Sequence, residues 1–164
     1  MKNFFKSILV IALSLFCINN SSFASVSTQE EIQAEMDKIM ELNNTDFNSF
    51  YNKSELVGTN RSSFNLSVSE YKLKNKATID SLSKIIESIQ QIEASPEFTD
   101  GEKTSKINDL IQKSNEELNN TGSSAINFLT GLGRFMPTIT YSKFKKSFIE
   151  YYNDFYINEN EIEL

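Results

Sequence analysis

The sequence contains no histidine and only one cysteine among its 164 residues. The lack of histidine excludes Ser-His-Asp and Cys-His catalytic arrangements as well as histidine-ligated zinc sites. The one cysteine, Cys17, lies in an apolar N-terminal segment that we expect to be removed, which leaves a chain without disulfide or thiol chemistry. The remaining chain must therefore be stabilised by packing, and any catalysis would depend on carboxylates, Lys, Tyr or Ser.

The first 24 residues have the pattern of an export signal. Lys2 and Lys6 precede an apolar run over residues 8–18, and the segment closes on Ser22-Phe23-Ala24. This run is shorter than the roughly 20 apolar residues that a membrane-spanning helix needs. We therefore expect a signal peptide at 1–24, cleavage after Ala24, and export to the periplasm or beyond the cell.

Cleavage is the favoured fate of this N-terminal segment, and two alternatives rank after it. The first is retention as a membrane anchor. The second is acylation at Cys17, which is disfavoured because bulky Leu15 and Phe16 precede Cys17 where a lipoprotein signal has a small residue. The absence of disulfides from an exported domain of this size favours a bacterial source.

Charge indicates which partners to expect after export. Removal of residues 1–24 leaves 14 basic and 22 acidic residues, a net charge of −8. Nucleic acids and anionic membranes bind clustered Lys and Arg, so nucleic acid is not an expected partner and membrane binding is disfavoured. Another protein, particularly a basic one, is the expected partner. We expect one helical domain at 25–156 and an acidic, frayed tail at 157–164.

The first helix is predicted to begin near Gln29. Thr28 and Glu31 have the spacing of a capping box, in which each side chain bonds a free backbone N–H of the other residue. Apolar residues then follow three-and-four spacing as far as Tyr51, with a polar patch at 43–45 where the helix could bend or break. Gly58 provides the stop signal.

The second helix carries the clearest apolar stripe of the chain, from Tyr71 to Ile92, and Pro96 ends it. N-terminal to this stripe, Phe64, Leu66 and Val68 alternate with polar residues, a pattern that also fits a short strand. No partner strand is evident in the sequence. We therefore interpret 62–68 as a loop leading into the helix.

Two further helical regions complete the predicted fold. One begins near Thr99 or Asp100 and continues to Leu132, either as one helix broken at residues 119–122 or as two short helices. The other extends from Thr140 to Tyr156 and has aromatic residues along one face. The sequence thus predicts an all-α fold, an antiparallel bundle of four or five helices.

One dipeptide suggests an enzymatic alternative. Glu87-Ser88 resembles the Glu-Ser dipeptide of lytic transglycosylases, in which a glutamic acid protonates a glycosidic oxygen. The Gly-Leu-Met-Gln-type segment of that family has no match in residues 90–93. Glu87 also lies beside the apolar stripe, where a solvent-exposed residue is expected, so the surface interpretation is favoured over a catalytic one. No acidic group has the layout of a calcium loop, and no metal or cofactor is expected.

Tyrosines of the last helical region are the candidates for partner binding. Tyr151, Tyr152 and Tyr156 fall on more than one helical face. Most aromatic residues at helical spacing belong to a core, but tyrosine is also enriched in binding hot spots. We expect at least one of the three to be available to a partner.

Three hypotheses for function follow. The leading one is an exported, non-enzymatic interaction protein, such as a periplasmic inhibitor or immunity-type factor, an adaptor or a holding chaperone, that binds through its helix faces. The second is an envelope glycan hydrolase or transglycosylase that uses Glu87. The third is a secreted membrane-interacting protein that uses the aromatic helix, with Lys143, Lys145 and Lys146 providing part of the required basic character.

Overall fold

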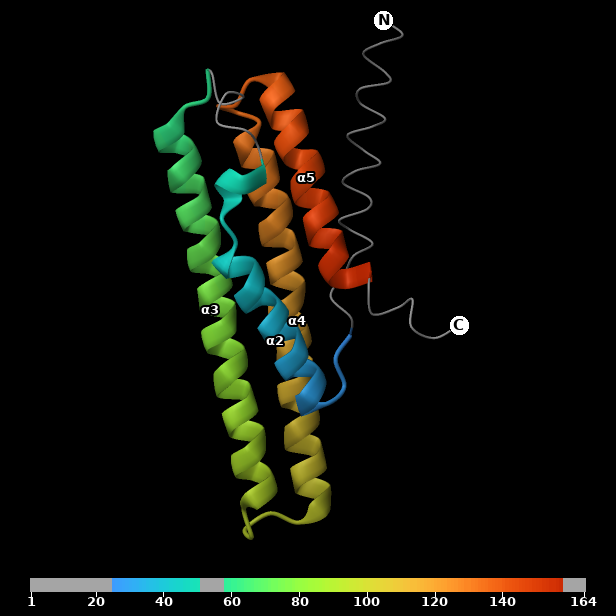
Figure 1. Cartoon of the computed structure of the whole chain (residues 1–164). Coiled ribbons are helices and arrows are strands. Elements are labelled where there is room, and N and C mark those ends of the chain that lie inside the picture. Colours follow the sequence, from blue (N-terminus) through green and yellow to red (C-terminus); the bar gives the residue numbers. More distant parts are fainter. Residues whose placement is uncertain (1–24, 51–57, 158–164) are drawn as a thin grey trace, which may run out of the picture.

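The computed structural model describes residues 25–50 and 58–157. This part of the chain is all-helical, with four α-helices, a single 3-10 turn and no strand. The helices alternate in direction along the bundle (Figure 1). In chain order the elements are α2 (Gln29–Asn44), η1 (Phe47–Phe50), α3 (Arg61–Ala94), α4 (Asp100–Leu132) and α5 (Thr138–Ile157).

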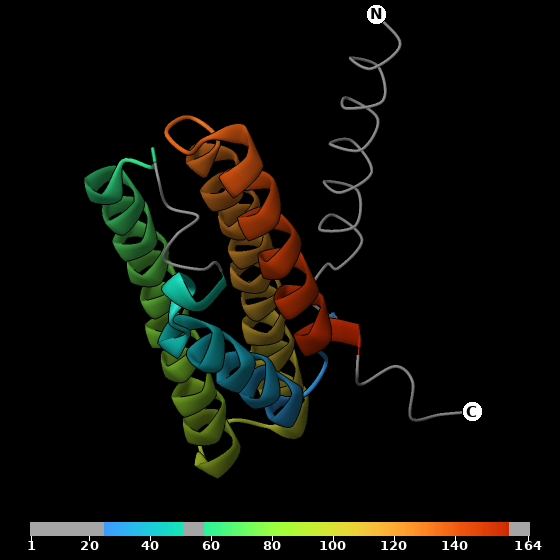
Figure 2. The ribbon, with the colours of Figure 1, turned by 45° about the horizontal axis from the view of Figure 1, so that its top comes forward.

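The two longest helices, α3 and α4, form the frame of the bundle. They contain 34 and 33 residues, so each is about 50 Å long. They run antiparallel, and the shorter helices α2 and α5 both pack against one side of the pair (Figure 1 and Figure 2). Each short helix covers only part of the frame, α2 towards the α3–α4 turn and α5 towards the opposite end.

Two hydrophobic clusters follow one another along this frame. The cluster under α2 is aliphatic, and its buried residues are Val26, Ile32, Met36, Ile39, Leu82, Ile85, Ile86, Ile89 and Leu118. The cluster under α5 and η1 is rich in rings, including Phe47, Phe64, Tyr71, Phe128, Phe144, Phe148 and Tyr152. The aromatic residues of the last helix are therefore largely part of the core, the more common role of such a stripe.

Phe47 connects η1 to the aromatic cluster. Its ring lies 5.5 Å from that of Phe128 and 5.9 Å from that of Phe148. On its other side, the Lys72 ammonium lies 5.4 Å from the Phe47 ring centroid and donates a 2.8 Å hydrogen bond to the Thr45 carbonyl. These contacts hold the chain against α3 just after α2 ends.

The predicted helix starts at Thr28 and Thr99 are confirmed. Both residues form capping boxes, with Glu31 and Glu102 respectively. The first helix does break at the polar patch, because α2 ends at Asn44. Gly58 has a φ of +86°, and a Cβ at this position would lie 3.2 Å from Pro137 Cγ, so a glycine fits the turn before α3.

The expectation of a loop at 62–68 is wrong. The helix α3 begins at Arg61, ten residues before Tyr71, and the side chain of Asn60 caps it by accepting a 3.1 Å bond from the Ser63 amide. Phe64 and Val68 lie four residues apart and continue the inward-facing stripe, whereas Leu66 is exposed. The alternation that resembled a strand is one face of a helix crossed by an exposed leucine.

The break expected at residues 119–122 is also absent. The helix α4 is continuous from Asp100 to Leu132. Leu118 and Ala125 are buried on either side of this segment, and Thr121 bonds across to Thr78 of α3. Packing on both sides outweighs the low helix propensity of the Asn, Thr and Gly residues.

A short segment before α2 is tied to α4 by one asparagine. The Val26 amide donates to Asn115 Oδ1 at 2.9 Å, and Asn115 Nδ2 donates to the Val26 carbonyl at 3.0 Å. Val26 is 3% exposed and belongs to the aliphatic cluster. The described chain is thus anchored from its second residue.

We predict that Phe148→Ala lowers the free energy of unfolding by about 3–5 kcal/mol, because it leaves a cavity among the rings of the aromatic cluster. The control is Leu66→Ala, which removes a side chain that is 60% exposed and should change stability by about 0.5 kcal/mol or less. Urea unfolding followed by circular dichroism measures both. Equal losses for the two variants would contradict the described core.

Candidate binding groove

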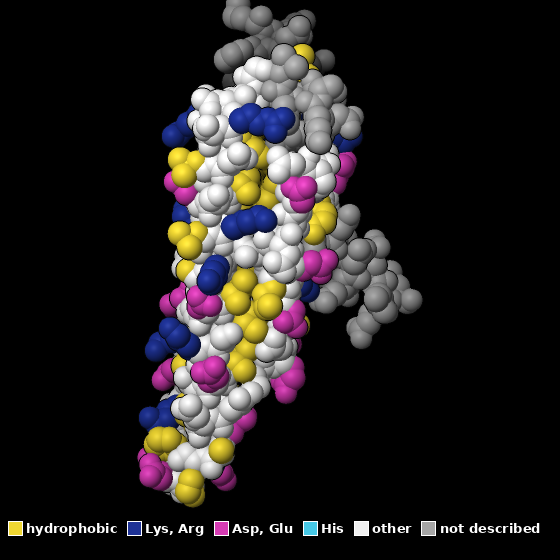
Figure 3. Space-filling model, turned by 60° about the vertical axis from the view of Figure 1, so that its left-hand side comes forward, with side chains coloured by type: hydrophobic (Ala, Val, Ile, Leu, Met, Phe, Trp, Pro, Cys, Tyr) yellow, Lys and Arg dark blue, Asp and Glu magenta, His cyan; other side chains and the backbone are white. Residues whose placement is uncertain are grey.

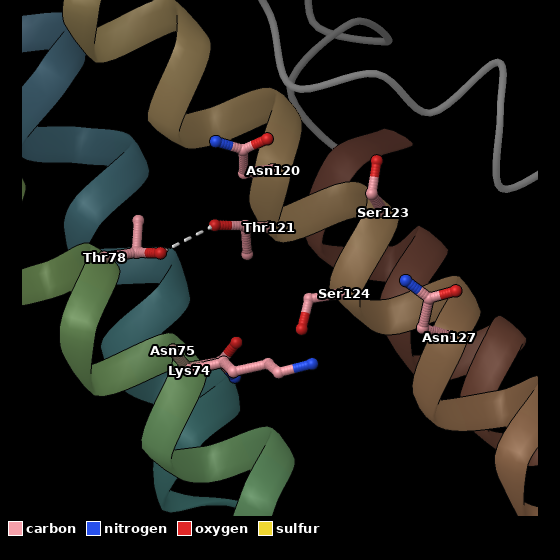
Figure 4. A pocket seen from close by; sticks show the side chains of 8 residues that line it. All are labelled: Lys74, Asn75, Thr78, Asn120, Thr121, Ser123, Ser124 and Asn127. Carbon is pink, nitrogen blue, oxygen red and sulfur yellow. Dashed lines mark hydrogen bonds between the residues drawn. The ribbon is translucent and has the colours of Figure 1, made fainter.

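A polar furrow lies between α3 and α4. Three hollows with shared lining residues form it, two of about 300 Å³ and one of about 120 Å³. Only α3 and α4 line these hollows, and around the central one α2 lies behind the two helices (Figure 4). The central hollow is lined by Lys74, Asn75, Thr78, Asn120, Thr121, Ser123, Ser124 and Asn127.

The furrow follows from the periodicity of the two helices. On α3, four lining residues recur every seven positions, at Ser67, Lys74, Ser81 and Ser88. On α4, the heptad-spaced lining residues are Leu110, Glu117, Ser124 and Gly131. Residues seven apart lie nearly on one side of a helix, so both helices turn a stripe of mainly polar and small residues towards the furrow. The serines and the glycine of these stripes leave space between the helices.

Buried hydroxyl groups bridge the two helices under the central hollow. Thr121 Oγ1 donates a 3.2 Å hydrogen bond to Thr78 Oγ1, and both side chains are buried (Figure 4). Towards the α3–α4 turn, Ser81 Oγ donates to the Glu117 carboxylate at 3.0 Å. Hydrogen bonds thus take the place of apolar packing along this side of the helix pair.

Asn75 is the most informative residue of the furrow. It is 1% exposed and lines the central hollow, yet neither its amide oxygen nor its amide nitrogen has a hydrogen-bond partner among the described residues. The Ser124 hydroxyl, facing it from α4, is also buried and without such a partner. A buried polar group left unpaired costs about 1–3 kcal/mol. These groups therefore favour a polar molecule that can enter the hollow.

Tyr71 connects the furrow to the aromatic cluster. It lines the smallest hollow, and its ring stacks on Phe128 with centroids 4.6 Å apart. Burial raises the pKa of the Tyr71 phenol well above its ordinary value, nearby Tyr152 adds to the rise, and the adjacent Asn75 amide opposes it. The amide and the phenol lie close together on α3, and neither has a hydrogen-bond partner of good geometry among the described residues. Tyr71 is consequently a neutral group at physiological pH.

Charged residues concentrate at the two ends of the furrow. The end near α5 has Glu70 beside Lys74, and the other end has two lysines and two glutamates, Lys84, Lys113, Glu116 and Glu117. In the central hollow Lys74 is the one charged lining residue. Because the charges at each end balance, the furrow as a whole does not select strongly for an anion or a cation.

Glu87 does not line any of these three hollows. Its side chain is exposed on α3, as the apolar stripe indicated, and its neighbour Ser88 bonds the Lys84 carbonyl of its own helix at 2.7 Å. The geometry therefore gives no support to a catalytic role for Glu87, which would need an apolar pocket to hold a proton.

The three candidate tyrosines have different surroundings. Tyr152 is 1% exposed and stacks with Phe148, so it belongs to the core and is not a surface for a partner. Tyr151 is half-buried, and its hydroxyl lies 2.8 Å from Thr45 Oγ1. The side chain of Tyr156 is outside the described residues. Burial of the aromatic stripe also removes the apolar face that a membrane-binding α5 would need.

Asn75, Thr78 and Ser124 are not among the site residues predicted from the sequence. A signal for the first two was present, since Asn75 and Thr78 lie four and seven residues after Tyr71, at positions that the apolar stripe would fill. Polar residues at core positions of a strong helix indicate either a buried network or a site. The contribution of α4 depends on the register between the helices, which the sequence does not reveal.

Comparisons with protein families, with curated proteins and with solved structures find no match for this chain. Within residues 25–50 and 58–157, no helix is long and apolar enough to cross a membrane. The same residues contain no cluster of three or more acidic or cysteine side chains suited to a metal ion.

We predict that Asn75→Leu raises the free energy of unfolding by about 1–3 kcal/mol, because it removes a buried amide without a partner. The matched control is Asn115→Leu, which removes an amide with two hydrogen bonds to Val26 and should lower stability by a similar amount. Urea unfolding of both variants measures these changes in the free energy of unfolding. Destabilisation by Asn75→Leu as large as that of the control would mean that the Asn75 amide is satisfied in the folded protein.

A second prediction concerns alkaline stability. An unfolded tyrosine loses its proton near pH 10.0, whereas Tyr71 keeps its proton because its folded pKa is raised. Its contribution to stability is therefore present below pH 10 and is lost as the pH rises above that value, by roughly 1 kcal/mol at pH 11. Tyr71→Phe should reduce the loss of stability between pH 8 and pH 11 by about that amount in urea unfolding. An unchanged pH dependence would contradict the burial of this phenol.

Proposed function

We propose that this chain is an exported, non-enzymatic interaction protein that binds another protein through the exposed side of α3. The observation that carries the proposal is a pair of exposed leucines on this helix. Leu66 is 60% exposed and Leu73 is 68% exposed, although the same helix buries a largely apolar stripe on its other side. These two leucines contribute nothing to the core that would account for their apolar character.

The two leucines form a ridge beside the furrow. They lie seven residues apart, which places them on one side of α3 at a distance of about 10 Å along the helix. Two residues that line the furrow lie close to them in sequence. Glu70 is between the two leucines, and Lys74 directly follows Leu73. On this side of the bundle, Figure 3 shows several separate hydrophobic patches among charged and other polar side chains. An apolar centre with a polar rim is the usual composition of a protein interface.

The charge of the chain favours a basic partner. The whole chain carries a net charge of −6, and residues 25–164 alone carry −8. Such a field increases the rate of encounter with a positively charged protein, and the contacts at the leucine ridge then provide specificity. An inhibitor or immunity-type factor, an adaptor and a holding chaperone all act in this manner, without chemistry on the partner.

The proposal is tested by affinity capture from a cell-envelope extract with the tagged full chain, with identification of the retained proteins by mass spectrometry. We expect one stoichiometric partner, and we expect Leu73→Glu to abolish its retention, because a charge in a desolvated interface centre is strongly unfavourable. The matched control is Ile139→Glu, which alters a 74% exposed residue of α5 and should retain the partner.

Retention of the same proteins by Leu73→Glu and by the unaltered chain would show that the ridge is not the binding surface. Absence of any stoichiometric partner at both low and moderate salt would remove the support for an interaction protein.

A further inference from the structure

The central hollow of the furrow has a chemical composition that is unusual for the space between two packed helices. All eight of its lining residues are polar, with three amides, two serine and two threonine hydroxyls and one ammonium group. Amides and hydroxyls each donate and accept hydrogen bonds. A ligand that satisfies this lining must itself present closely spaced groups that both donate and accept.

The buried Asn75 amide points to a ligand independently of the lining composition. It is 1% exposed, and its oxygen and nitrogen are both unpaired among the described residues. Figure 4 shows Asn75 on α3 next to Lys74, and the Lys74 side chain extends towards Ser124 of α4. A ligand that displaces the Lys74 side chain from this space could bring a hydroxyl group or an amide to Ser124 and Asn75.

The furrow is long enough for a chain of several units. Its lining on α3 extends from Ser67 to Ser88, a distance of about 30 Å along the helix. The adjoining hollows share Lys74, Ser124 and Asn120 with the central one, so the surface is continuous. An elongated ligand could therefore occupy all three hollows.

The composition distinguishes between classes of elongated ligand. An amphipathic helix docks through an apolar stripe, and apolar side chains placed against the central lining would desolvate its polar groups without replacing their hydrogen bonds. An extended peptide presents only one backbone N–H and one backbone C=O per residue, and its apolar side chains would desolvate the lining in the same way. A sugar presents hydroxyls around each ring and matches the lining much more closely. The balanced charges at the two ends fit a ligand of little or no net charge.

We infer that the furrow between α3 and α4 is a binding site for a short, neutral oligosaccharide, with Asn75, Ser124 and Asn127 as its central contacts. The Asn75 amide bonds a sugar hydroxyl or acetamido group, and the neighbouring hydroxyls and Lys74 orient the ring. The site lies beside the leucine ridge and shares Glu70 and Lys74 with its rim, but sugar binding does not require a protein partner.

The inference is tested by NMR titration of the 15N-labelled full chain with tetrasaccharides of N-acetylglucosamine, of glucose and of galacturonate, and with an unstructured Gly-Ser peptide as a non-sugar probe. We expect saturable shifts of the Asn75 and Asn127 side-chain amides with at least one neutral tetrasaccharide. Asn75→Leu and Asn127→Leu should each weaken this binding about tenfold or more. Asn127 is exposed, so its variant keeps the core intact.

The control is Asn108→Leu, the same substitution at an exposed position of α4 outside the three hollows, which should leave the affinity unchanged. Absence of saturable shifts with both neutral sugars would overturn the inference. So would binding that Asn75→Leu and Asn127→Leu leave unchanged, tighter binding of galacturonate, or tighter binding of the Gly-Ser peptide.

Discussion

The bundle depends on α3 and α4, each about 50 Å long, which bury their apolar residues on the side that faces α2 and α5. The seam towards α2 and α5 contains an aliphatic and an aromatic cluster. The other seam is lined mainly by amides, hydroxyls and balanced charges, with Ile85 and Leu110 at one end and Tyr71 and Phe128 at the other. Because hydrophobic burial is obtained on one side, the polar side can remain open without loss of the fold. The site and the fold thus share the same two helices but use different faces of them.

The helical architecture could be predicted from the sequence because its signals are local. Capping boxes at Thr28 and Thr99 and the stop at Pro96 set helix boundaries whatever the tertiary packing. The prediction was wrong where packing overrides local preference. The segment at 62–68 is helical because Phe64 is needed in the aromatic cluster, and α4 continues through 119–122 because Leu118 and Ala125 are buried on either side.

The candidate site was much less predictable. Asn75 and Thr78 interrupt the apolar stripe of α3, so their unusual position could be read from one helix alone. Whether they lie opposite Thr121 and Ser124 depends on the register between α3 and α4, which are connected at one end only. The tyrosines of α5 show the same limit, since Tyr151 and Tyr152 are adjacent in sequence but one is half-buried and the other is fully enclosed. Helical spacing identifies a face, and only the packing shows what covers it.

The most direct test of an open polar seam is a crystal structure of the protein at a resolution that shows ordered water. We predict that neither Oδ1 nor Nδ2 of Asn75 has a protein group within hydrogen-bond distance, and that the faces of α3 and α4 stay separated along the furrow. An Asn75 amide bonded on both sides by protein groups, with the two helices closed over it, would contradict the account.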